Sequence, residues 1–492
     1  MALPQQNSQR GATDEQKVAE AAEDFDLVIL GSGVGSSTLS WAVAKAGERV
    51  AVIERQYIGG SCPNIACLPS KNVIHSAKVA SYFNRGKEFG MSNVRCQVDM
   101  VGVRERKRTM VAGFNAFELQ AYKDTGVDFI MGEGVFLAPK LLQVSLPDGT
   151  KRLISGKKIV IGVGTRSRLE AIPGLAESRP MTHVQALELD VVPEHLVVLG
   201  GGYIGLEFTQ AMRRFGSRVT LIVRNDRLLQ SEDEDVSEGI RALLIDEGIE
   251  ILFDTNLKSV SGESGKHVAL TLVQDGKEQI LEASHLLVAT GRIPNTANIG
   301  LAEAGVSLTE NGFIKVNERL ETTAPGVWAI GECAGSPAFT HIAFDDFRLL
   351  RDNFAGGNHV TTGRQVPFCL FIDPEFAQVG LNETQAKAQG VPYRLAKLPL
   401  ALVLRTHTLS ETRGFMKALI DAKTDQILGF VALGVSAGEI MGAVQIAMIG
   451  HMPYTLLRDA IFTHPTLLEG LGPLFASVPP LEQPPAKPSS PA

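Results

Sequence analysis

The feature that most constrains the fold of this chain is a pattern that occurs twice: an apolar strand, a glycine turn and a helix. The first copy spans residues 25–54 and the second spans residues 195–224. Each copy predicts a parallel pair of strands joined by a helix, which is the building unit of a dinucleotide-binding domain. A chain of 492 residues with 44% apolar content is long enough to form both domains and a further one.

In the first copy, a buried strand runs into the turn Gly31-Ser32-Gly33 and a helix follows at once. Glycines allow a tight turn, and the bare amides at the helix N-terminus then face a pyrophosphate. Ser36 stands at the third fingerprint position and is small enough for the helix to pack closely on the strand. Glu54 closes the second strand, and we expect it to accept hydrogen bonds from an adenosine ribose.

The second copy carries all three fingerprint glycines, Gly200, Gly202 and Gly205, after an apolar strand. Its second strand is followed by Arg224 instead of an acid. A guanidinium at this point pairs with a 2′-phosphate, so the sequence favours NADPH, with NADH as the alternative. Two fingerprints in the correct context make a much stronger prediction than either one alone.

Cys62 and Cys67 directly follow the first copy, so we expect them beside the first nucleotide site. If Cys62 opens a helix, Cys67 lies just over one turn later, and the two sulfurs are able to close a small disulfide ring. The helix N-terminus then favours a thiolate, and a strained, accessible disulfide is reducible. The alternatives are two buried structural thiols or a metal site, but no further Cys or His lies nearby at metal-site spacing.

The overall composition limits the partners. The net charge of -7 provides no basic surface for nucleic acid or anionic lipid, so small molecules are the expected partners. The five cysteines (Cys62, Cys67, Cys96, Cys333 and Cys369) are too few for a disulfide scaffold. Residues 1–22 lack the layout of a secretion signal, and no apolar run is long enough to span a bilayer, so we expect a cytoplasmic enzyme.

The regions outside the two copies also have distinct patterns. Strands that end in glycine, at 158–164 and 286–292, bracket the second copy, which suggests an inserted domain. From about Gln365 the chain changes to short apolar strands (368–372, 415–420 and 427–433) and a helix at 437–450, which indicates a separate α+β domain. The first 22 residues lack an apolar face and the last 16 are rich in proline, so we expect both ends to be disordered.

These residues resemble the class I pyridine nucleotide-disulfide oxidoreductases, the family of glutathione reductase, lipoamide dehydrogenase and mercuric reductase. The resemblance covers nearly the whole chain and includes, beyond the cysteine segment, the motifs at 289–295, 327–335, 373–380, 437–439 and 463–466. It implies an α/β fold with two Rossmann-like dinucleotide-binding domains and a C-terminal α+β dimerisation domain. It also implies FAD at the first site, NAD(P)H at the second, and a homodimer.

The resemblance and the composition together predict the domain boundaries. They are a disordered N-terminus (1–22), the first part of an FAD-binding domain (23–180), an NAD(P)-binding domain (181–290), the second part of the FAD-binding or central domain (291–362), a dimerisation domain (363–476) and a disordered proline-rich tail (477–492).

The resemblance also implies roles for individual residues. Cys67 is similar to the thiol next to the flavin, and Cys62 to the interchange thiol that attacks the substrate. Lys71 resembles the lysine beside the reactive nitrogen of the flavin and would pair with Glu207. Tyr203 resembles the tyrosine that gates the nicotinamide pocket.

His464 resembles the catalytic acid-base of the family, which is oriented by a carboxylate, here Glu469, and reaches the cysteines of the partner subunit. Histidine suits this task because its ordinary pKa lies near neutrality. The family's usual aspartate in the late flavin-binding motif is a glutamate here. The further cofactor-binding positions that the resemblance implies are Ser61, Gly164, Gly291, Arg292, Glu332 and Thr340.

The acceptor is less well defined by the sequence. The segments 424–429 and 453–454 are nearest to mercuric reductase-like sequences, but the chain has no C-terminal cysteine pair and no N-terminal Cys-x-x-Cys for delivering a metal ion. It retains His464, which points to proton transfer during thiol-disulfide exchange, so we favour a disulfide acceptor. The alternatives are a reductase for metal ions of the Hg(II) type, quinones or electrophiles, and a flavin-binding subunit of a larger complex.

Overall fold

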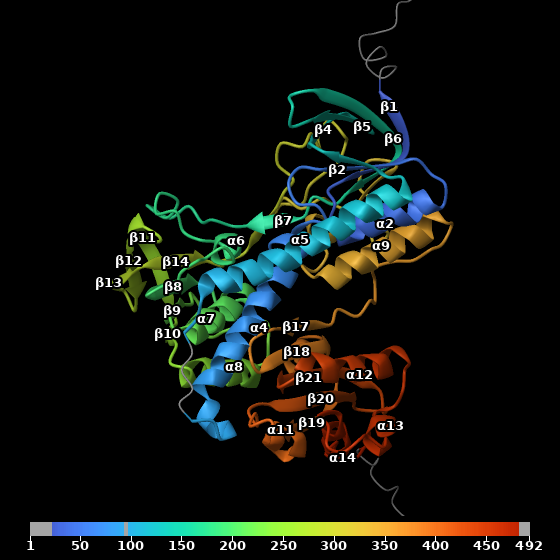
Figure 1. Cartoon of the computed structure of the whole chain (residues 1–492). Helices are drawn as coiled ribbons and strands as arrows, with labels where there is room; N and C mark the ends of the chain where they lie inside the picture. Colours follow the sequence, from blue (N-terminus) through green and yellow to red (C-terminus); the bar gives the residue numbers. More distant parts are fainter. Residues whose placement is uncertain (1–21, 93–96, 482–492) are drawn as a thin grey trace, which may run out of the picture. The chain divides into compact units, whose positions relative to one another are not determined.

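The computed structural model describes residues 22–92 and 97–481, which form two compact units (Figure 1). The first unit comprises the described part of Met1–Pro69, from residue 22 on, with Arg108–Arg166 and Arg292–Arg364. The second comprises the described residues of Ser70–Lys107, Ser167–Gly291 and Gln365–Ala492. Cys96, all but the last residue of the predicted disordered N-terminus (1–22), and most of the predicted disordered tail (477–492) lie outside the described residues.

A largely parallel sheet forms the centre of the first unit. Strand β1 (Glu23–Leu30) pairs in parallel with β2 (Val50–Glu54) on one side and with β6 (Lys151–Ile161) on the other. The strand order is β3-β2-β1-β6-β5-β4, and β16 also pairs with β6. The remaining strands of this sheet are β3 (Asp128–Met131), β4 (Glu133–Ala138), β5 (Leu141–Ser145) and β16 (Val327–Ala329).

Both faces of this sheet are buried. On β1, Leu27 and Ile29 point into one apolar core and Val28 and Leu30 into another, because successive side chains of a strand point to opposite faces. Helices α2 (Val34–Lys45) and α9 (Thr340–Phe354) pack side by side on the first of these faces (Figure 1). A strand buried on both faces explains the uninterrupted apolar run in the sequence.

The second copy of the pattern forms a smaller parallel sheet in the second unit, with the order β10-β9-β8-β14. The sequence predicted that a strand at 286–292 would follow this domain. That strand, β14, belongs to the domain itself, because it pairs with β8. A neighbouring antiparallel sheet has the order β11-β12-β13. The elements are β8 (His195–Leu199), α7 (Tyr203–Phe215), β9 (Arg218–Ile222), α8 (Glu234–Asp246), β10 (Glu250–Leu252), β11 (Thr255–Glu263), β12 (His267–Gln274), β13 (Lys277–Ala283) and β14 (His285–Val288).

The C-terminal part of the second unit is built on an antiparallel sheet with the order β17-β18-β21-β20-β19. Helix α12 packs on β18 and β21 (Figure 1). The elements are β17 (Phe368–Leu370), β18 (Glu375–Gly380), α10 (Glu383–Ala388), β19 (Tyr393–Pro399), α11 (Leu404–Thr408), β20 (Phe415–Asp421), β21 (Ile427–Gly434), α12 (Ala437–Ile449), α13 (Tyr454–Asp459) and α14 (Leu471–Ala476). The α/β class predicted from the sequence is confirmed.

The first residues of the predicted tail pack against this part of the unit. Val478 packs on the apolar core, and Arg394 donates a hydrogen bond to the carbonyl of Pro479 over 3.2 Å. The other elements of the chain are α3 (Ser61–Asn64), α4 (Cys67–Asn84), α5 (Met100–Thr125), α6 (His183–Ala186), the paired strands β7 (Thr165–Ser167) and β15 (Arg292–Pro294), and the 3-10 turns η1 (Gly86–Phe89), η2 (Gly331–Ala334), η3 (Leu400–Leu402) and η4 (Leu468–Gly470). None of the helices in the described part of the chain has the length and apolar character that a membrane span needs.

Candidate active site

Both glycine turns bring backbone directly against backbone. A Cβ atom on Gly31 would lie 2.4 Å from the carbonyl oxygen of Gly162, and one on Gly200 would lie 2.6 Å from that of Ala289. Both glycines also have left-handed φ angles, +100° and +107°, which other residues adopt at a cost. These two positions therefore require glycine for two separate reasons.

The second glycine of each turn borders open space. Apart from the adjoining backbone, no described atom lies within 4 Å of the place where a Cβ on Gly33 or Gly202 would be. These glycines are the N-cap residues of α2 and α7, where the backbone amides have no partners within the helix. A pyrophosphate fits such a cradle, since its oxygens accept from bare amides and its charge suits the helix N-terminus. The residues present thus fit a dinucleotide at each turn.

The third fingerprint position differs between the turns, and the structure explains how the chain compensates. In the second turn, a Cβ on Gly205 would lie 1.9 Å from the oxygen of Gly200, and the opposing residue is Ala289. In the first turn the helix carries Ser36 instead, and the opposing strand residue is Gly162, where a Cβ would lie 2.3 Å from the Ser36 hydroxyl oxygen. In the second turn the glycine of the facing pair is on the helix, whereas in the first turn it is on the strand.

This compensation predicts a specific double-mutant result. Gly162→Ala should destabilise the protein by about 1–3 kcal/mol, because the added methyl group overlaps the buried Ser36 hydroxyl. Adding Ser36→Gly should recover most of the loss, because the pair then reproduces the arrangement of the second turn. Urea unfolding of the wild type, both single variants and the double variant would measure this. Equal destabilisation of the single Gly162→Ala and double variants would contradict the compensation.

Glu54 lies at the end of β2, buried, with its carboxylate held by the protein. One oxygen accepts from the amide and the hydroxyl of Ser32 at 2.9 and 2.8 Å, and the other accepts from the amides of Gln56 and Tyr57 at 2.8 and 3.0 Å. A ribose hydroxyl would share an oxygen that is already bonded. Ser32, which sequence reasoning did not single out, therefore fixes the acid beside the first turn.

The two cysteines lie on consecutive helices rather than on one. The single helix expected from Cys62 to Cys67 is broken because Ile65 leaves the helical region, with φ of -138°, and α4 begins anew at Cys67. The 18-residue helix α4 thus directs its N-terminus at Cys67, so the helix dipole favours a thiolate there and not at Cys62. A Cβ on Gly60 would lie 2.6 Å from the Cα of Gly33, so the cysteine segment starts on the first pyrophosphate turn.

The sulfur atoms share a polar neighbour. The Cys67 Sγ lies 3.2 Å from the hydroxyl oxygen of Thr340, the first residue of α9. Both cysteines are free thiols in this structure, and the hydrogen bond with Cys67, together with burial, raises the pKa of Cys62. When one of the two is a thiolate, the neighbouring sulfur and the Thr340 hydroxyl are its hydrogen-bonding partners.

Substitutions of Thr340 test this contact. Thr340→Ala should raise the pH midpoint for forming the Cys67 thiolate in the reduced protein by about one unit, because a hydrogen bond to a charged group contributes about 1.5–3 kcal/mol. Thr340→Ser keeps the hydroxyl and should behave like the wild type. The readout is a pH titration of the long-wavelength absorption that a thiolate produces beside an oxidised flavin. An unchanged midpoint in Thr340→Ala would contradict the assignment.

In the second unit, Lys71 and Glu207 form an ion pair. The Lys71 ammonium donates to both carboxylate oxygens of Glu207 at 2.9 and 2.8 Å, and Glu207 also accepts from the amide of Phe371 at 3.0 Å. Lys71 also lies 4.8 Å from the centroid of the Phe371 ring. Tyr203 begins α7 directly after Gly202, and burial raises the pKa of its hydroxyl. The ion pair with Glu207 and the Phe371 ring thus fix the position of the Lys71 ammonium.

Glu332, the residue that replaces the expected aspartate, is engaged within the first unit. Its carboxylate accepts from the Thr165 hydroxyl and from the Arg292 guanidinium, the latter at 3.1 Å. Arg292 also donates to the Thr165 hydroxyl at 2.7 Å. Thr165 was not predicted as a site residue from the sequence, although it directly follows the strand that ends in Gly164. Ser61 begins α3, and Gly164 and Gly291 adopt left-handed φ angles with open space beside them.

His464 and Glu469 are in contact at 2.9 Å, from Nδ1 of the ring to a carboxylate oxygen. A carboxylate on Nδ1 fixes the tautomer and leaves Nε2 to exchange protons. The imidazole is 65% exposed, so Nε2 is accessible from outside this chain. Arg224, the predicted 2′-phosphate ligand, is 71% exposed, and its contact with Glu170 is a loose 4.0 Å.

The remaining described cysteines, Cys333 and Cys369, lie in or against apolar cores. Cys333 is fully buried in an apolar core, and burial raises the pKa of its thiol to about 11. Its sulfur donates to the carbonyls of Ile330 and Ile161 at 3.3 and 3.5 Å. Burial also raises the pKa of Cys369. Cys333 is therefore a packing residue.

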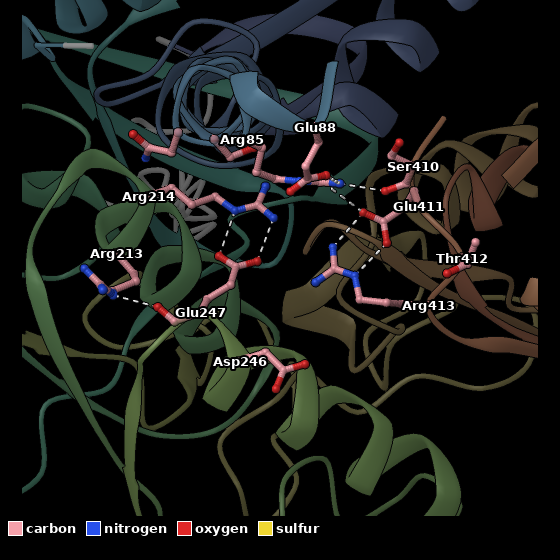
Figure 2. A pocket seen from close by; sticks show the side chains of 12 residues that line it. Arg85, Glu88, Arg213, Arg214, Asp246, Glu247, Ser410, Glu411, Thr412 and Arg413 are labelled. Carbon is pink, nitrogen blue, oxygen red and sulfur yellow. Dashed lines mark hydrogen bonds and ion pairs between the residues drawn. The ribbon is translucent and has the colours of Figure 1, made fainter. Parts of the chain in front are cut away.

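A cavity of about 470 Å³ in the second unit contains none of these residues (Figure 2). Arg214 forms a two-point ion pair with Glu247, and Glu411 is shared between Arg413 and Arg85. Because its arginines are largely neutralised by carboxylates, the cavity has no excess charge to attract a nucleotide phosphate. It is lined by Ser81, Asn84, Arg85, Glu88, Arg213, Arg214, Asp246, Glu247, Ser410, Glu411, Thr412 and Arg413.

Two family models match this chain. Residues 25–346 match the pyridine nucleotide-disulphide oxidoreductases, and residues 366–474 match the dimerisation domain of the pyridine nucleotide-disulphide oxidoreductases. Together they cover both glycine turns, the cysteine pair and the His464 segment.

Similar proteins occur in several bacteria. The chain is 35% identical over 461 residues to the probable pyridine nucleotide-disulfide oxidoreductase RclA of Escherichia coli (strain K12), which covers 92% of this chain and 99% of the relative. It is 31% identical to a mercuric reductase of Staphylococcus aureus, covering 91% and 81% of the two chains. It is 30% identical to a dihydrolipoyl dehydrogenase of Bacillus subtilis (strain 168), covering 92% and 97%.

Solved structures of a flavoprotein disulfide reductase also match this chain. The HOCl-induced flavoprotein disulfide reductase RclA from Escherichia coli matches with a TM-score of 0.83 and 34% identity, over 92% of this chain and 99% of that chain. A Cu(II) complex of that protein matches with a TM-score of 0.84 and 33% identity, over the same shares of the two chains.

Proposed function

Because the chain belongs to the pyridine nucleotide-disulphide oxidoreductase family, we propose that it reduces a disulfide acceptor with electrons from NADPH through the Cys62–Cys67 pair. The family, the enzyme class, and FAD and NAD(P)H as cofactors were all predicted from the sequence, and the comparisons confirm them. When bound, FAD accepts a hydride equivalent from the nicotinamide and passes two electrons to a disulfide. The roles of individual residues in the transfer of electrons to the acceptor are what we propose.

The observation that carries the proposal is the position of the two cysteines. The cysteine segment begins where Gly60 rests on Gly33, and α4 directs its N-terminus at Cys67. The cysteines therefore follow directly from the pyrophosphate cradle, and Cys67 is the sulfur that the protein stabilises as an anion. Cys62, whose pKa is raised by its neighbour and by burial, is protonated more readily and becomes nucleophilic when a base removes its proton.

The oxidative half-reaction uses the two cysteines, His464 and one further proton from solvent. The Cys62 thiolate attacks the acceptor disulfide, a mixed disulfide forms, and the first acceptor thiolate leaves and takes a proton from His464. The Cys67 thiolate then attacks the Cys62 sulfur, which restores the Cys62–Cys67 disulfide and releases the second acceptor thiolate, and this thiolate takes its proton from solvent. Glu469 stabilises the imidazolium while it holds the proton. One disulfide thus yields two thiols for each pair of electrons.

A homodimer is part of this proposal, supported by the match to the dimerisation domain and by apolar residues exposed on it. Ile446 and Ile449 on α12 are 63% and 57% exposed, and Ile461, close to His464 in the sequence, is fully exposed. A partner subunit would bury these side chains. The exposed His464 would then complete the site of the other subunit.

The preference for NADPH predicts a selective effect of Arg224. Arg224→Ala should raise the KM for NADPH about tenfold and leave that for NADH almost unchanged, because only NADPH has the 2′-phosphate that the guanidinium would bind. Arg218→Ala is the matched control, since Arg218 is also exposed and lies at the other end of β9. Steady-state kinetics with both nucleotides measure the effect. Equal changes for NADPH and NADH would contradict the preference.

The acceptor is tested with the purified, FAD-loaded protein. NADPH oxidation would be followed with a panel of disulfides, quinones, Hg(II) and Cu(II), in the wild type, Cys62→Ser and His464→Gln. We expect the fastest reaction with a disulfide, a loss of more than a hundredfold in Cys62→Ser, and a smaller loss in His464→Gln. Full activity of Cys62→Ser with the best acceptor would rule out the dithiol mechanism.

A metal-ion reductase is the second candidate, supported by the similarity to a mercuric reductase and to a protein solved as a Cu(II) complex. The same cysteine pair would bind a soft metal ion as thiolates. In the panel above, a higher kcat/KM with Hg(II) or Cu(II) than with every disulfide, lost in Cys62→Ser, would favour this candidate.

A further inference from the structure

A buried carboxylate in the first unit has no assigned role. Asp346 is fully buried on α9, and one of its oxygens accepts from the amide of Gly331 and from the hydroxyl of Ser336, both at 2.8 Å. Gly331 begins the turn η2 and Ser336 lies just beyond its end. A single oxygen therefore holds both ends of the turn that carries Glu332.

The charge of Asp346 is neutralised by one guanidinium. Its other oxygen accepts from Arg364 at 2.6 Å, and Arg364 also donates to the Ser336 hydroxyl at 3.3 Å. Gly331 and Gly335 have left-handed φ angles of +68° and +78°, so the turn itself is built from flexible residues. The Asp346 contacts thus provide the rigidity that the glycines do not.

Helix α9 connects this turn to the redox cysteine. Its first residue, Thr340, contacts the Cys67 sulfur, and Asp346 lies six residues further on, which is roughly 9 Å along a helix. The helix is itself held against α2, because a Cβ on Gly35 would lie 2.4 Å from the Ala343 oxygen. Helix α9 therefore fixes both the turn Gly331–Gly335 and the position of the Cys67 sulfur.

We propose that Asp346 is a positioning residue that sets the flavin-box turn Gly331–Gly335 at a fixed distance from Cys67 by anchoring it to α9. Asp346 acts through the turn and touches no reacting atom. Loss of its charge frees the turn, so that FAD is held less tightly and the flavin lies less well against the Cys67 sulfur. This inference rests on the proposed function, because it assumes that the turn faces the flavin.

The test compares Asp346→Asn with Asp345→Asn in the FAD-loaded protein. Asp345 is the matched control, since its carboxylate is 3.6 Å from the same guanidinium but 40% exposed. We expect Asp346→Asn to release FAD about tenfold faster, measured by the fluorescence of free flavin. It should also lose at least half of the long-wavelength thiolate–flavin absorption after anaerobic reduction by one equivalent of NADPH. Asp345→Asn should stay within twofold of the wild type in FAD release.

The outcomes separate this proposal from the proposed function. If the reduced wild type never shows the long-wavelength absorption, the dithiol function fails. If the wild type shows it and Asp346→Asn matches Asp345→Asn in both measurements, only the role of Asp346 is overturned. Should Asp346→Asn not fold, Ser336→Ala decides, because it removes one hydrogen bond to the same oxygen and keeps the ion pair. A Ser336→Ala variant identical to the wild type in FAD release and absorption would overturn the proposal.

Discussion

The close approach of backbone to backbone at two glycine turns is the contact on which both nucleotide sites depend. Gly31 and Gly200 each meet a carbonyl of a neighbouring strand end at a distance that no side chain allows. This approach sets α2 and α7 directly after the strands, with Gly33 and Gly202 open at the helix N-termini. A larger residue at either first glycine would move the helix and close the cradle.

The proposed redox site is an extension of the first turn. Gly60 rests on Gly33, the cysteine segment follows, and α4 begins at Cys67 because the chain breaks its helix at Ile65. Helix α9 then approaches from the other part of the unit and brings Thr340 to the sulfur. The protein thereby gives the two cysteines different environments: Cys67 lies at the N-terminus of α4, and the pKa of Cys62 is raised by its hydrogen bond with Cys67 and by burial. Two thiols of unequal character are what an ordered exchange reaction needs.

Local patterns predicted the parts of the structure that depend on neighbours in the sequence. The run at 195–224 forms β8, α7 and β9, since apolar periodicity and glycine turns act over a few residues. The complementary pair of Ser36 and Gly162 could not be recognised, because the two residues lie far apart in the sequence and only the fold brings them together. Asp346 belonged to no motif, and only the fold brings its carboxylate to Gly331 and Arg364. The break at Ile65 is a backbone conformation without a residue signature.

The central claim, that electrons reach an acceptor through Cys62 and Cys67, is tested most directly by thiol labelling. The oxidised protein would be alkylated without air before and after one equivalent of NADPH, and each cysteine quantified by mass spectrometry. The account predicts that Cys62 and Cys67 are unlabelled before reduction, that Cys62 is labelled first afterwards, and that the buried Cys333 stays unlabelled in the folded protein. Labelling of Cys62 and Cys67 that is already complete in the oxidised protein, and unchanged by NADPH, would contradict it.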